Sequence, residues 1–527
     1  MSYFKETTVQ GVTDAGTAQS ISATPEGHLE VAIHAPTLPF GSVHVESLTP
    51  IFQLDPLYGL NNSEMLATTG LAVGTGANSA TATAASNAFT CSTGTTVYSF
   101  GSLQTRRRLR YRPGQGVIGR FSAKFSAPAA SSILVAGFGT GESGFYVGYN
   151  NTSFGILYST GGVREIQTMT ITTASTATNN YNVTLPSGQV VAVTATNNAS
   201  TLKTAYEISR GTFPGWSATQ RGSTVIFLAN DVGNKALITL GQSGAGTPAV
   251  GANVETLAGV AATDTWIPQA SWNGDKMDGT GSTGFTLTKT YLNVFQIGIQ
   301  YLGAGCVTFE IEVPATSGGN NGVFVTCHTI NFPNSRTTSS VSQPSFPFTM
   351  AAYSGGSTTD VSVSVTSVGG FIEGIRALTG PRQTYTRTST TVTTGAYTAI
   401  MTIRNERVFG NRASQVVVNL LSFGGAHDDA TPVTLYLIRD ATLVGTPNFA
   451  TWATSSSTYV DTAATTCTIA SNDQIIFSIP VGASGTVLFP FSDSVTLQPG
   501  ETITLAAQTV TGTATYTIMS LNTREDQ

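Results

Sequence analysis

The chain has 527 residues, which is enough for about three to four domains of ordinary size. Charged residues make up only 10% of it, and β-branched and small residues dominate, so the composition excludes coiled coils and helix bundles. An apolar content of 40% with a net charge of -5 also excludes general disorder. We therefore expect a mostly β protein whose weakly charged surface suits an assembly component better than a freely diffusing enzyme.

Residues 1–60 have neither the basic nor the apolar region of a signal peptide, and their scattered prolines favour an extended anchoring arm. No apolar run reaches the roughly 18 residues of a membrane span, so we expect cytoplasmic synthesis and no membrane span. The cysteines lack a C-x-x-C pair and are expected to be free thiols. A disulfide between Cys306 and Cys327, which flank one predicted hairpin, is the alternative.

The pattern of the remaining chain predicts two β-sandwiches, the first of which contains an insertion. Short apolar runs separated by turn residues predict the first half of a jelly-roll or concanavalin-like sandwich over 61–165 and its second half over 251–383. Residues 67–96 have little periodicity and are expected to form a loop or a flat strand. Residues 384–527 predict a C-terminal β-sandwich, with a frayed charged tail at 522–527.

Residues 166–250 predict a small α+β module inserted between the two halves. Its expected elements are a hairpin that turns at Pro186-Ser187-Gly188, a helix over 201–209, and a second hairpin around Arg221-Gly222. Ser200 or Thr201 is the candidate N-cap of that helix. Insertions of this kind are tolerated at exposed loop tips.

Five arginines lie within seven residues: Arg106, Arg107, Arg108, Arg110 and Arg112. Such a cluster can contact nucleic acid or phosphate. The negative net charge and the short length of the cluster favour a second interpretation, in which the arginines pair with carboxylates across a sheet or a subunit interface. We therefore predict an interface and no nucleic-acid partner.

No catalytic, cofactor or metal site is predicted. Asn273, Asp275 and Asp278 resemble part of a calcium loop, but their spacing is irregular and Gly284 stands where a closing carboxylate is needed. His427-Asp428-Asp429 has no second histidine or cysteine nearby in the sequence. Tyr149 and Trp272 are candidate glycan contacts, with packing in the core as the alternative.

Several stretches together resemble one protein family: 110–116 (RYRPGQG), 144–150 (GFYVGYN), 154–157 (FGIL), 162–165 (GVRE) and 272–281 (WNGDKMDGTG). These stretches are similar to parts of structural proteins of large double-stranded DNA viruses of aquatic hosts, both tailed phages and algal giant viruses. The resemblance covers roughly residues 25–370 and carries no catalytic residues.

The resemblance implies a non-enzymatic virion protein: a minor capsid, vertex, spike or fibre component that is made in the host cytoplasm and located in the virion. Its implied partners are other capsid or tail proteins and further copies of itself, with a trimer preferred. Two other hypotheses stay open. One is a host-attachment protein that binds a surface glycan, and the other is a virion-associated glycoside hydrolase.

Overall fold

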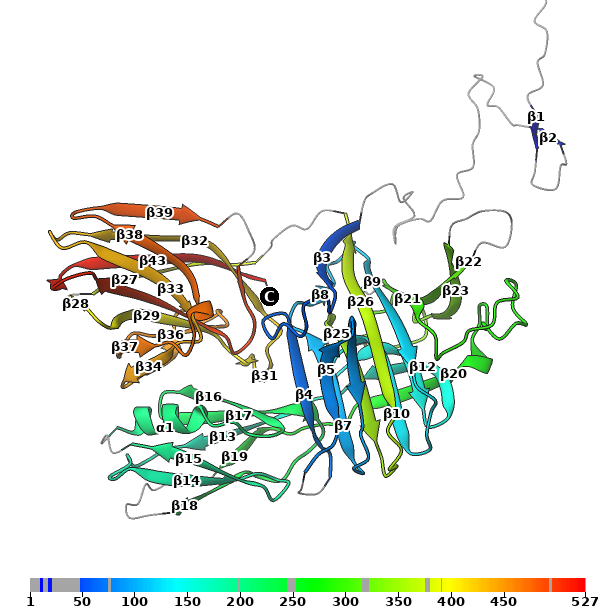
Figure 1. The fold of residues 1–527 in the computed structure, drawn as a ribbon, viewed down its shortest axis with the longest axis horizontal. Helices are drawn as coiled ribbons and strands as arrows, with labels where there is room; N and C mark the ends of the chain where they lie inside the picture. Colours follow the sequence, from blue (N-terminus) through cyan, green and yellow to red (C-terminus); the bar gives the residue numbers. More distant parts are fainter. Residues whose placement is uncertain are drawn as a thin grey trace, which may run out of the picture.

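The computed structural model describes residues 48–73, 77–196, 200–243, 253–300, 302–314, 322–374, 380–389, 391–491 and 495–526, and the backbone of 10–12 and 18–20. The chain is almost entirely antiparallel β structure, as its composition predicts. The strands form three bodies, each around its own hydrophobic core. We call these bodies the N-terminal sandwich, the inserted module and the C-terminal sandwich. Figure 1 shows them as three bodies.

The N-terminal sandwich consists of two facing sheets. The first contains β4 Met65–Leu71, β7 Ser99–Thr105, β10 Ser132–Gly139, β11 Gly144–Asn150, β12 Ser153–Thr160, β20 Thr263–Pro268 and β25 Phe348–Ser354. The second contains β3 Leu48–Leu54, β5 Thr81–Ala85, β6 Ala88–Ser92, β9 Val117–Phe125, β21 Asn293–Ile299, β22 Val307–Pro314, β23 Gly322–Ile330 and β26 Ser362–Glu373. A short pair, β8 Leu109–Arg110 and β24 Ser345–Phe346, lies beside them, and η1 Gln269–Ser271 follows β20.

The core of this sandwich is aromatic. Alternate residues of β9 point inward, and the ring of Phe121 stacks on that of Phe295 with centroids 5.5 Å apart. The ring of Phe121 also meets that of Phe348 from the opposite sheet. Interlocking rings of this kind bury large apolar areas and fix how the two sheets lie on each other.

The inserted module leaves the N-terminal sandwich after β12 and returns in β20, the strand that pairs with β12. Its sheets contain β13 Arg164–Thr170, β16 Trp216–Arg221, β17 Thr224–Val232 and β19 Val254–Leu257 in one, and β14 Asn179–Thr184, β15 Val190–Ala195 and β18 Thr239–Ser243 in the other. Helix α1 Thr201–Ser209 packs on this module, and the Ser200 side chain caps it by accepting from the Lys203 amide at 3.3 Å.

The C-terminal sandwich also has two sheets. One contains β27 Arg382–Ser389, β32 Val417–His427, β39 Thr486–Pro490, β40 Thr496–Leu497 and β43 Thr517–Asp526. The other contains β29 Tyr397–Asn405, β33 Val433–Arg439, β34 Thr442–Gly445, β35 Ala450–Thr451, β36 Thr458–Asp461, β37 Ala464–Thr468, β38 Ile475–Val481 and β41 Thr502–Thr509. The small pairs are β28 Val392–Thr393 with β42 Thr513–Ala514 and β30 Val408–Phe409 with β31 Arg412–Ala413, and η2 Asn472–Gln474 precedes β38.

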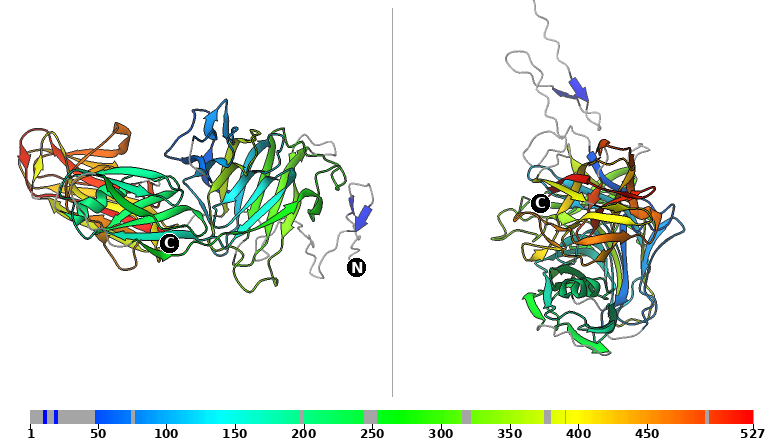
Figure 2. Two further views of the ribbon diagram at one scale, coloured as in Figure 1. Left: turned by 90° about the horizontal axis from the view of Figure 1, so that it is seen from below. Right: turned by 90° about the vertical axis from the view of Figure 1, so that its left-hand side faces the viewer.

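The inserted module and the C-terminal sandwich lie on the same side of the N-terminal sandwich (Figure 2). They contact each other through apolar residues, among them Tyr206 of α1 against Leu443 and Phe449. A second apolar contact brings Ile226 and Leu228 of β17 to Val408 and Ala413. The module is therefore fixed by its contacts with the C-terminal sandwich as well as by its connections to β12 and β20.

Two expectations from the sequence need correction. Residues 48–54, assigned to an extended arm, form β3, which pairs with β26 inside the sandwich. The charged tail is not frayed up to residue 526, because it completes β43 between β27 and β32. The four cysteines are free thiols, as expected, so the alternative of a Cys306–Cys327 disulfide is wrong. The rest of the predicted arm, 1–47, lies outside the described residues apart from the short hairpin of β1 Gln10–Val12 and β2 Ala18–Ser20.

Candidate functional site: an arginine-lined crevice between the sandwiches

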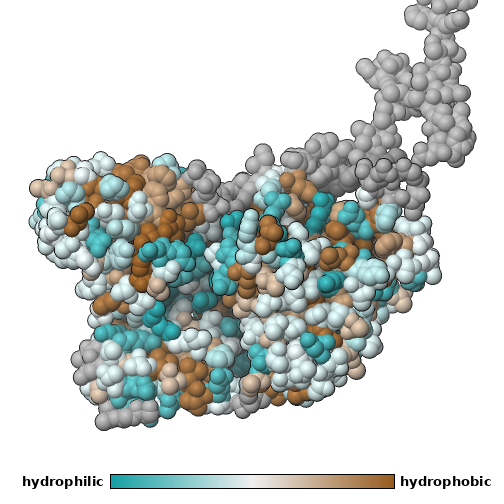
Figure 3. Space-filling view, in the orientation of Figure 1, coloured by the Kyte–Doolittle hydropathy of each residue, from teal (hydrophilic) through white to brown (hydrophobic). Residues whose placement is uncertain are grey.

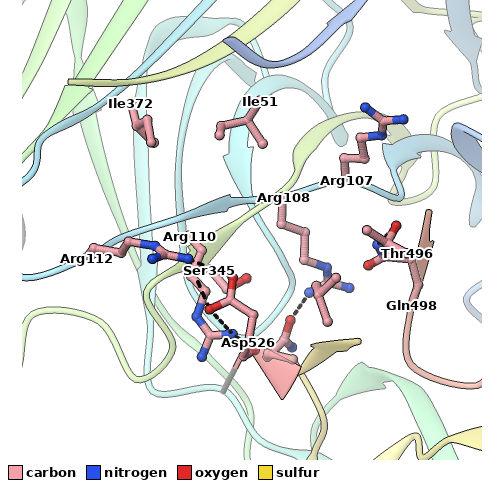
Figure 4. Close-up of a pocket in the computed structure, with 12 residues that line it drawn as sticks. Ile51, Arg107, Arg108, Arg110, Arg112, Ser345, Ile372, Thr496, Gln498 and Asp526 are labelled. Atoms are coloured by element: carbon pink, nitrogen blue, oxygen red, sulfur yellow. Dashed lines mark hydrogen bonds and ion pairs between the residues drawn. The ribbon is translucent and has the colours of Figure 1, made fainter. Parts of the chain in front are cut away.

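The arginine cluster forms one wall of a crevice between the two sandwiches because the local backbone is extended. Leu109 and Tyr111 turn into the core of the N-terminal sandwich, where they are 0% and 7% exposed. Side chains alternate along an extended chain, so Arg108, Arg110 and Arg112 all turn the other way. Figure 4 shows the three guanidinium groups directed into the crevice.

The opposite wall comes from the C-terminal sandwich. The crevice, which we call the arginine crevice, has a volume of about 50 Å³. Its lining residues are Ile51, Arg107, Arg108, Arg110, Arg112, Ser345, Ile372, Gln415, Val417, Thr496, Gln498 and Asp526. The space-filling view shows a hollow between the three bodies that is bordered by hydrophilic side chains (Figure 3).

Asp526, at the end of β43, pairs with two of the arginines. Arg112 Nη2 lies 3.0 Å from Asp526 Oδ2 and 3.2 Å from Oδ1. Arg110 Nη1 lies 3.8 Å from Asp526 Oδ1 and donates a hydrogen bond to its backbone carbonyl. Because both carboxylate contacts are partly buried, they are stronger than ion pairs on an open surface.

The two outer arginines have carboxylate partners of their own. Arg107 Nη2 lies 3.3 Å from Glu64 Oε1 within the N-terminal sandwich. Arg106 Nη1 lies 3.8 Å from Glu501 Oε1 of the C-terminal sandwich, and its Nε donates to the Asn62 carbonyl at 2.7 Å. The cluster therefore joins carboxylates within one chain; its predicted role between subunits stays a prediction.

Arg108 differs from its neighbours because no carboxylate within the described chain forms an ion pair with it. Arg108 Nη1 donates to the side-chain carbonyl Oε1 of Gln415, while its buried Nε has no hydrogen-bond partner among the residues that the structure describes. Burial, together with the positive charge of Arg164, lowers the pKa of Arg108 to about 10, and Glu142 offsets part of that shift. The guanidinium is therefore charged at neutral pH without a neutralising contact.

A second charged junction joins the inserted module to the C-terminal sandwich. Glu406 is fully buried, pairs with Arg404, and lies 3.4 Å from Arg221 Nη2 of the module. The Arg404 guanidinium lies 3.9 Å from the centre of the Phe449 ring, and that of Arg221 lies 4.6 Å from the Tyr459 ring. Two cation–π contacts and a shared carboxylate thus hold the arginines across this junction.

The two candidate glycan-binding rings do not face solvent. Tyr149 is 8% exposed and Trp272 is 3% exposed, and both belong to the core of the N-terminal sandwich. The ring centroids of Tyr149 and Phe154 are 5.1 Å apart, and Phe154 in turn meets Trp272. A sugar needs an exposed ring face for stacking, so packing in the core, the alternative interpretation, describes both residues.

The loop that resembles a calcium site is organised by its own hydrogen bonds. Asp275 accepts from the amides of Met277 and Thr283, both at 2.9 Å, and from the Thr283 hydroxyl at 2.7 Å. Burial alone would raise the pKa of Asp275, but these hydrogen bonds together lower it. Within the described part of the chain, no group of three or more His, Cys, Asp or Glu side chains could hold a metal ion.

The His427-Asp428-Asp429 segment is also structural. His427 is buried, with Nδ1 3.1 Å from the Thr517 hydroxyl. Asp429 accepts from the Thr515 amide at 3.0 Å and from its hydroxyl at 2.8 Å. These bonds lower the pKa of Asp429 to about 2, and the Thr515 hydroxyl makes the largest contribution.

Sequence reasoning did not find the partners of the arginines. Gln415 and Asp526 lie 307 and 414 residues beyond the arginines that they contact. Asp526 lies beside Glu525 in the charged tail at 522–527, and nothing in the sequence distinguishes the two carboxylates as partners of the arginines. Gln415 is uncharged and carries no signal of an arginine partner.

Comparisons with known proteins leave the family of this chain open. No protein-family model matches it, and no curated protein matches it. Among solved structures it is similar to a GH43 glycoside hydrolase with an engineered active site, at 10% identity and a TM-score of 0.20, over 70% of this chain. The chain spans about half, 49%, of the length of that hydrolase.

A second solved structure is the Faustovirus major capsid protein, at 8% identity and a TM-score of 0.11, covering 88% of this chain and 90% of the capsid protein. TM-scores this low establish a shared fold in neither case. Among the described residues, no helix has the length and apolarity needed to cross a membrane.

Proposed function

We propose that this chain is a non-enzymatic structural protein of a virus particle, in which it serves as a minor capsid, vertex, spike or fibre component. The observation that carries the proposal is the use of charge within the chain. In a sequence with only 10% charged residues, arginines and carboxylates gather at the junctions between the three β bodies. Such junctions fix the bodies at set positions, as a building block in an ordered shell requires.

The weakly charged outer surface supports the same function. Soluble monomers usually keep about 25–35% of their surface charged. The buried centres of protein interfaces are depleted of charged residues, so a weakly charged surface is suited to burial against other subunits. Under this proposal the partners are other capsid or tail proteins and further copies of the chain. The virion is then its location.

Host attachment through a glycan is the alternative function. Its two candidate residues, Tyr149 and Trp272, lie in the core, so no residue is assigned to glycan binding under this alternative. The glycoside hydrolase hypothesis has no pair of carboxylates that we can assign. Neither alternative has an observation in its favour.

Purified recombinant protein provides the first test of the proposal. Light scattering coupled to size-exclusion chromatography should find a defined homo-oligomer, with a trimer preferred, and electron microscopy should find particles of uniform shape. A chain that stays monomeric at every concentration and releases reducing sugar from host cell walls would contradict the proposal.

A further inference from the structure

The arginine crevice has an unusual charge balance. Four arginines and one carboxylate line it. A neighbouring cavity of about 310 Å³ shares its rim and is lined by three arginines, Arg106, Arg107 and Arg439, and by three carboxylates, Glu64, Asp473 and Glu501. The larger cavity is therefore balanced, while the smaller one has an excess of positive charge.

The excess charge is centred on Arg108. Asp526 forms ion pairs with Arg110 and Arg112, and Glu64 forms one with Arg107. The side-chain partner of Arg108 is instead the uncharged amide of Gln415. A buried charge is costly unless a counter-charge or further hydrogen bonds compensate it. Burial and then the positive charge of Arg164 lower the pKa of Arg108, and Glu142 offsets only part of that shift.

Three buried hydrogen-bonding atoms of residues that line the crevice have no partner among the described residues. Gln415 Oε1 accepts from Arg108, which fixes the orientation of the amide and leaves Gln415 Nε2 as a donor. Both Gln415 Nε2 and Arg108 Nε are buried donors with no acceptor. Gln498 Oε1, also in the lining, is a buried acceptor with no donor.

We infer that the arginine crevice binds one inorganic phosphate ion, which bridges the two sandwiches. The unprotonated oxygens of hydrogen phosphate accept from Arg108 Nε and Gln415 Nε2, and its P–OH group donates to Gln498 Oε1. Sulfate has the same shape but no proton at neutral pH, so it leaves the Gln498 oxygen unpaired. A cavity of about 50 Å³ has room for several water molecules or one small oxyanion, and a nucleotide does not fit.

This inference does not depend on the proposed function. It concerns a small ligand at a junction within one chain, and it holds whether the protein builds a particle or not. The bound ion would contact residues of both sandwiches, so it would stabilise their junction and raise the temperature at which they separate.

The test uses the full chain, freed of phosphate by dialysis, and the titrants are sodium phosphate, sodium sulfate and sodium chloride at pH 7 and equal ionic strength. Calorimetry should find one phosphate per chain, and phosphate should raise the melting temperature more than sulfate does.

Arg108→Gln should weaken phosphate binding about tenfold or more, since a charged hydrogen bond is lost. Arg336→Gln is the matched control, because it removes one positive charge from an exposed site outside the crevice and should leave binding unchanged.

A second variant keeps the test decisive if Arg108→Gln does not fold. Gln415→Glu places a carboxylate beside Arg108, so it should melt at a higher temperature than the wild type in chloride and should no longer respond to phosphate. Three results would overturn the inference: no phosphate effect beyond that of chloride, equal weakening in Arg108→Gln and Arg336→Gln, or a Gln415→Glu variant that still binds phosphate like the wild type. Equal affinity for sulfate would overturn the assigned role of Gln498.

Discussion

Asp429 shows how a single carboxylate can organise a loop in this weakly charged protein. It joins the segment after β32 to the turn before β43 through the amide and hydroxyl of Thr515. These bonds lower its pKa from 3.8 to about 2. The stability that it contributes is therefore fully present above pH about 4 and is lost as the pH falls through about 2.

We predict that Asp429→Asn lowers the melting temperature at pH 7, and that its difference from the wild type shrinks as the pH is lowered toward 2. Asp428→Asn is the matched control, because that neighbouring side chain is exposed and should leave the melting temperature unchanged. The measurement is thermal unfolding followed by circular dichroism between pH 2 and 7. A difference that stays constant over this range would argue against the role of the Asp429 charge.

The arginine cluster shows what the sequence can predict at the scale of residues. The positive charge of the arginines and their alternation along the chain from Arg108 to Arg112 are local properties. The sequence therefore predicts that these side chains pair with carboxylates at an interface. The partners could not be predicted, because Gln415 and Asp526 come from segments more than 300 residues away. Contacts between residues so far apart in the sequence depend on how the two sandwiches pack against each other, and no local sequence pattern predicts that packing.

Among the elements, helix α1 was predicted with the bounds that the structure has, Thr201–Ser209. Its cap residue and its apolar face are local signals. Residues 67–96, which are rich in Ala, Thr, Ser and Gly, left a loop and a flat strand as alternatives, and the structure forms strands β5 and β6 there. Strand formation depends on the pairing of β5 with β6 and of β6 with β26 rather than on the segment's own pattern.

Helix α1 also docks the inserted module on the C-terminal sandwich. The Tyr206 hydroxyl accepts a hydrogen bond from the buried Leu443 amide at 3.1 Å. We predict that Tyr206→Phe lowers the free energy of unfolding by about 1–3 kcal/mol, because that amide is left without its acceptor.

Tyr181→Phe provides the matched control within the same module. Tyr181 is buried, but its hydroxyl has no hydrogen-bond partner in the described part of the chain, so its removal should be neutral or slightly stabilising. Urea unfolding of both variants measures the difference. Equal effects of the two substitutions would show that the Leu443 contact does not stabilise the junction.

At the scale of the whole molecule, the fold class followed from composition, since little charge and many β-branched residues left few helical alternatives. The placement of the three bodies did not follow, because it depends on apolar contacts and charged junctions between residues far apart in the sequence.

We predict that Glu406→Gln lowers the free energy of unfolding by about 3 kcal/mol, since Arg404 and Arg221 then lose their shared charge. Glu255→Gln, at an exposed site on β19, should change it by less than about 0.5 kcal/mol. Urea unfolding compares the two, and similar losses would contradict this account of the junction.

The arginine crevice should likewise hold the two sandwiches together. Asp526→Asn weakens the contacts with Arg110 and Arg112, so small-angle X-ray scattering should find a larger radius of gyration for this variant than for the wild type. Asp360→Asn, in the N-terminal sandwich away from the crevice, should leave the radius unchanged. An unchanged radius in Asp526→Asn would mean that other contacts are sufficient to fix the bodies.

The central claim is that these junctions make a rigid component of a virus particle. Quantitative mass spectrometry of virus particles purified from a culture that produces the chain tests it most directly. The proposal predicts that the chain is present at a fixed copy number relative to the major capsid protein, in every preparation and after washing with high salt. Its absence from purified particles, or a copy number that falls with each washing step, would contradict the proposal.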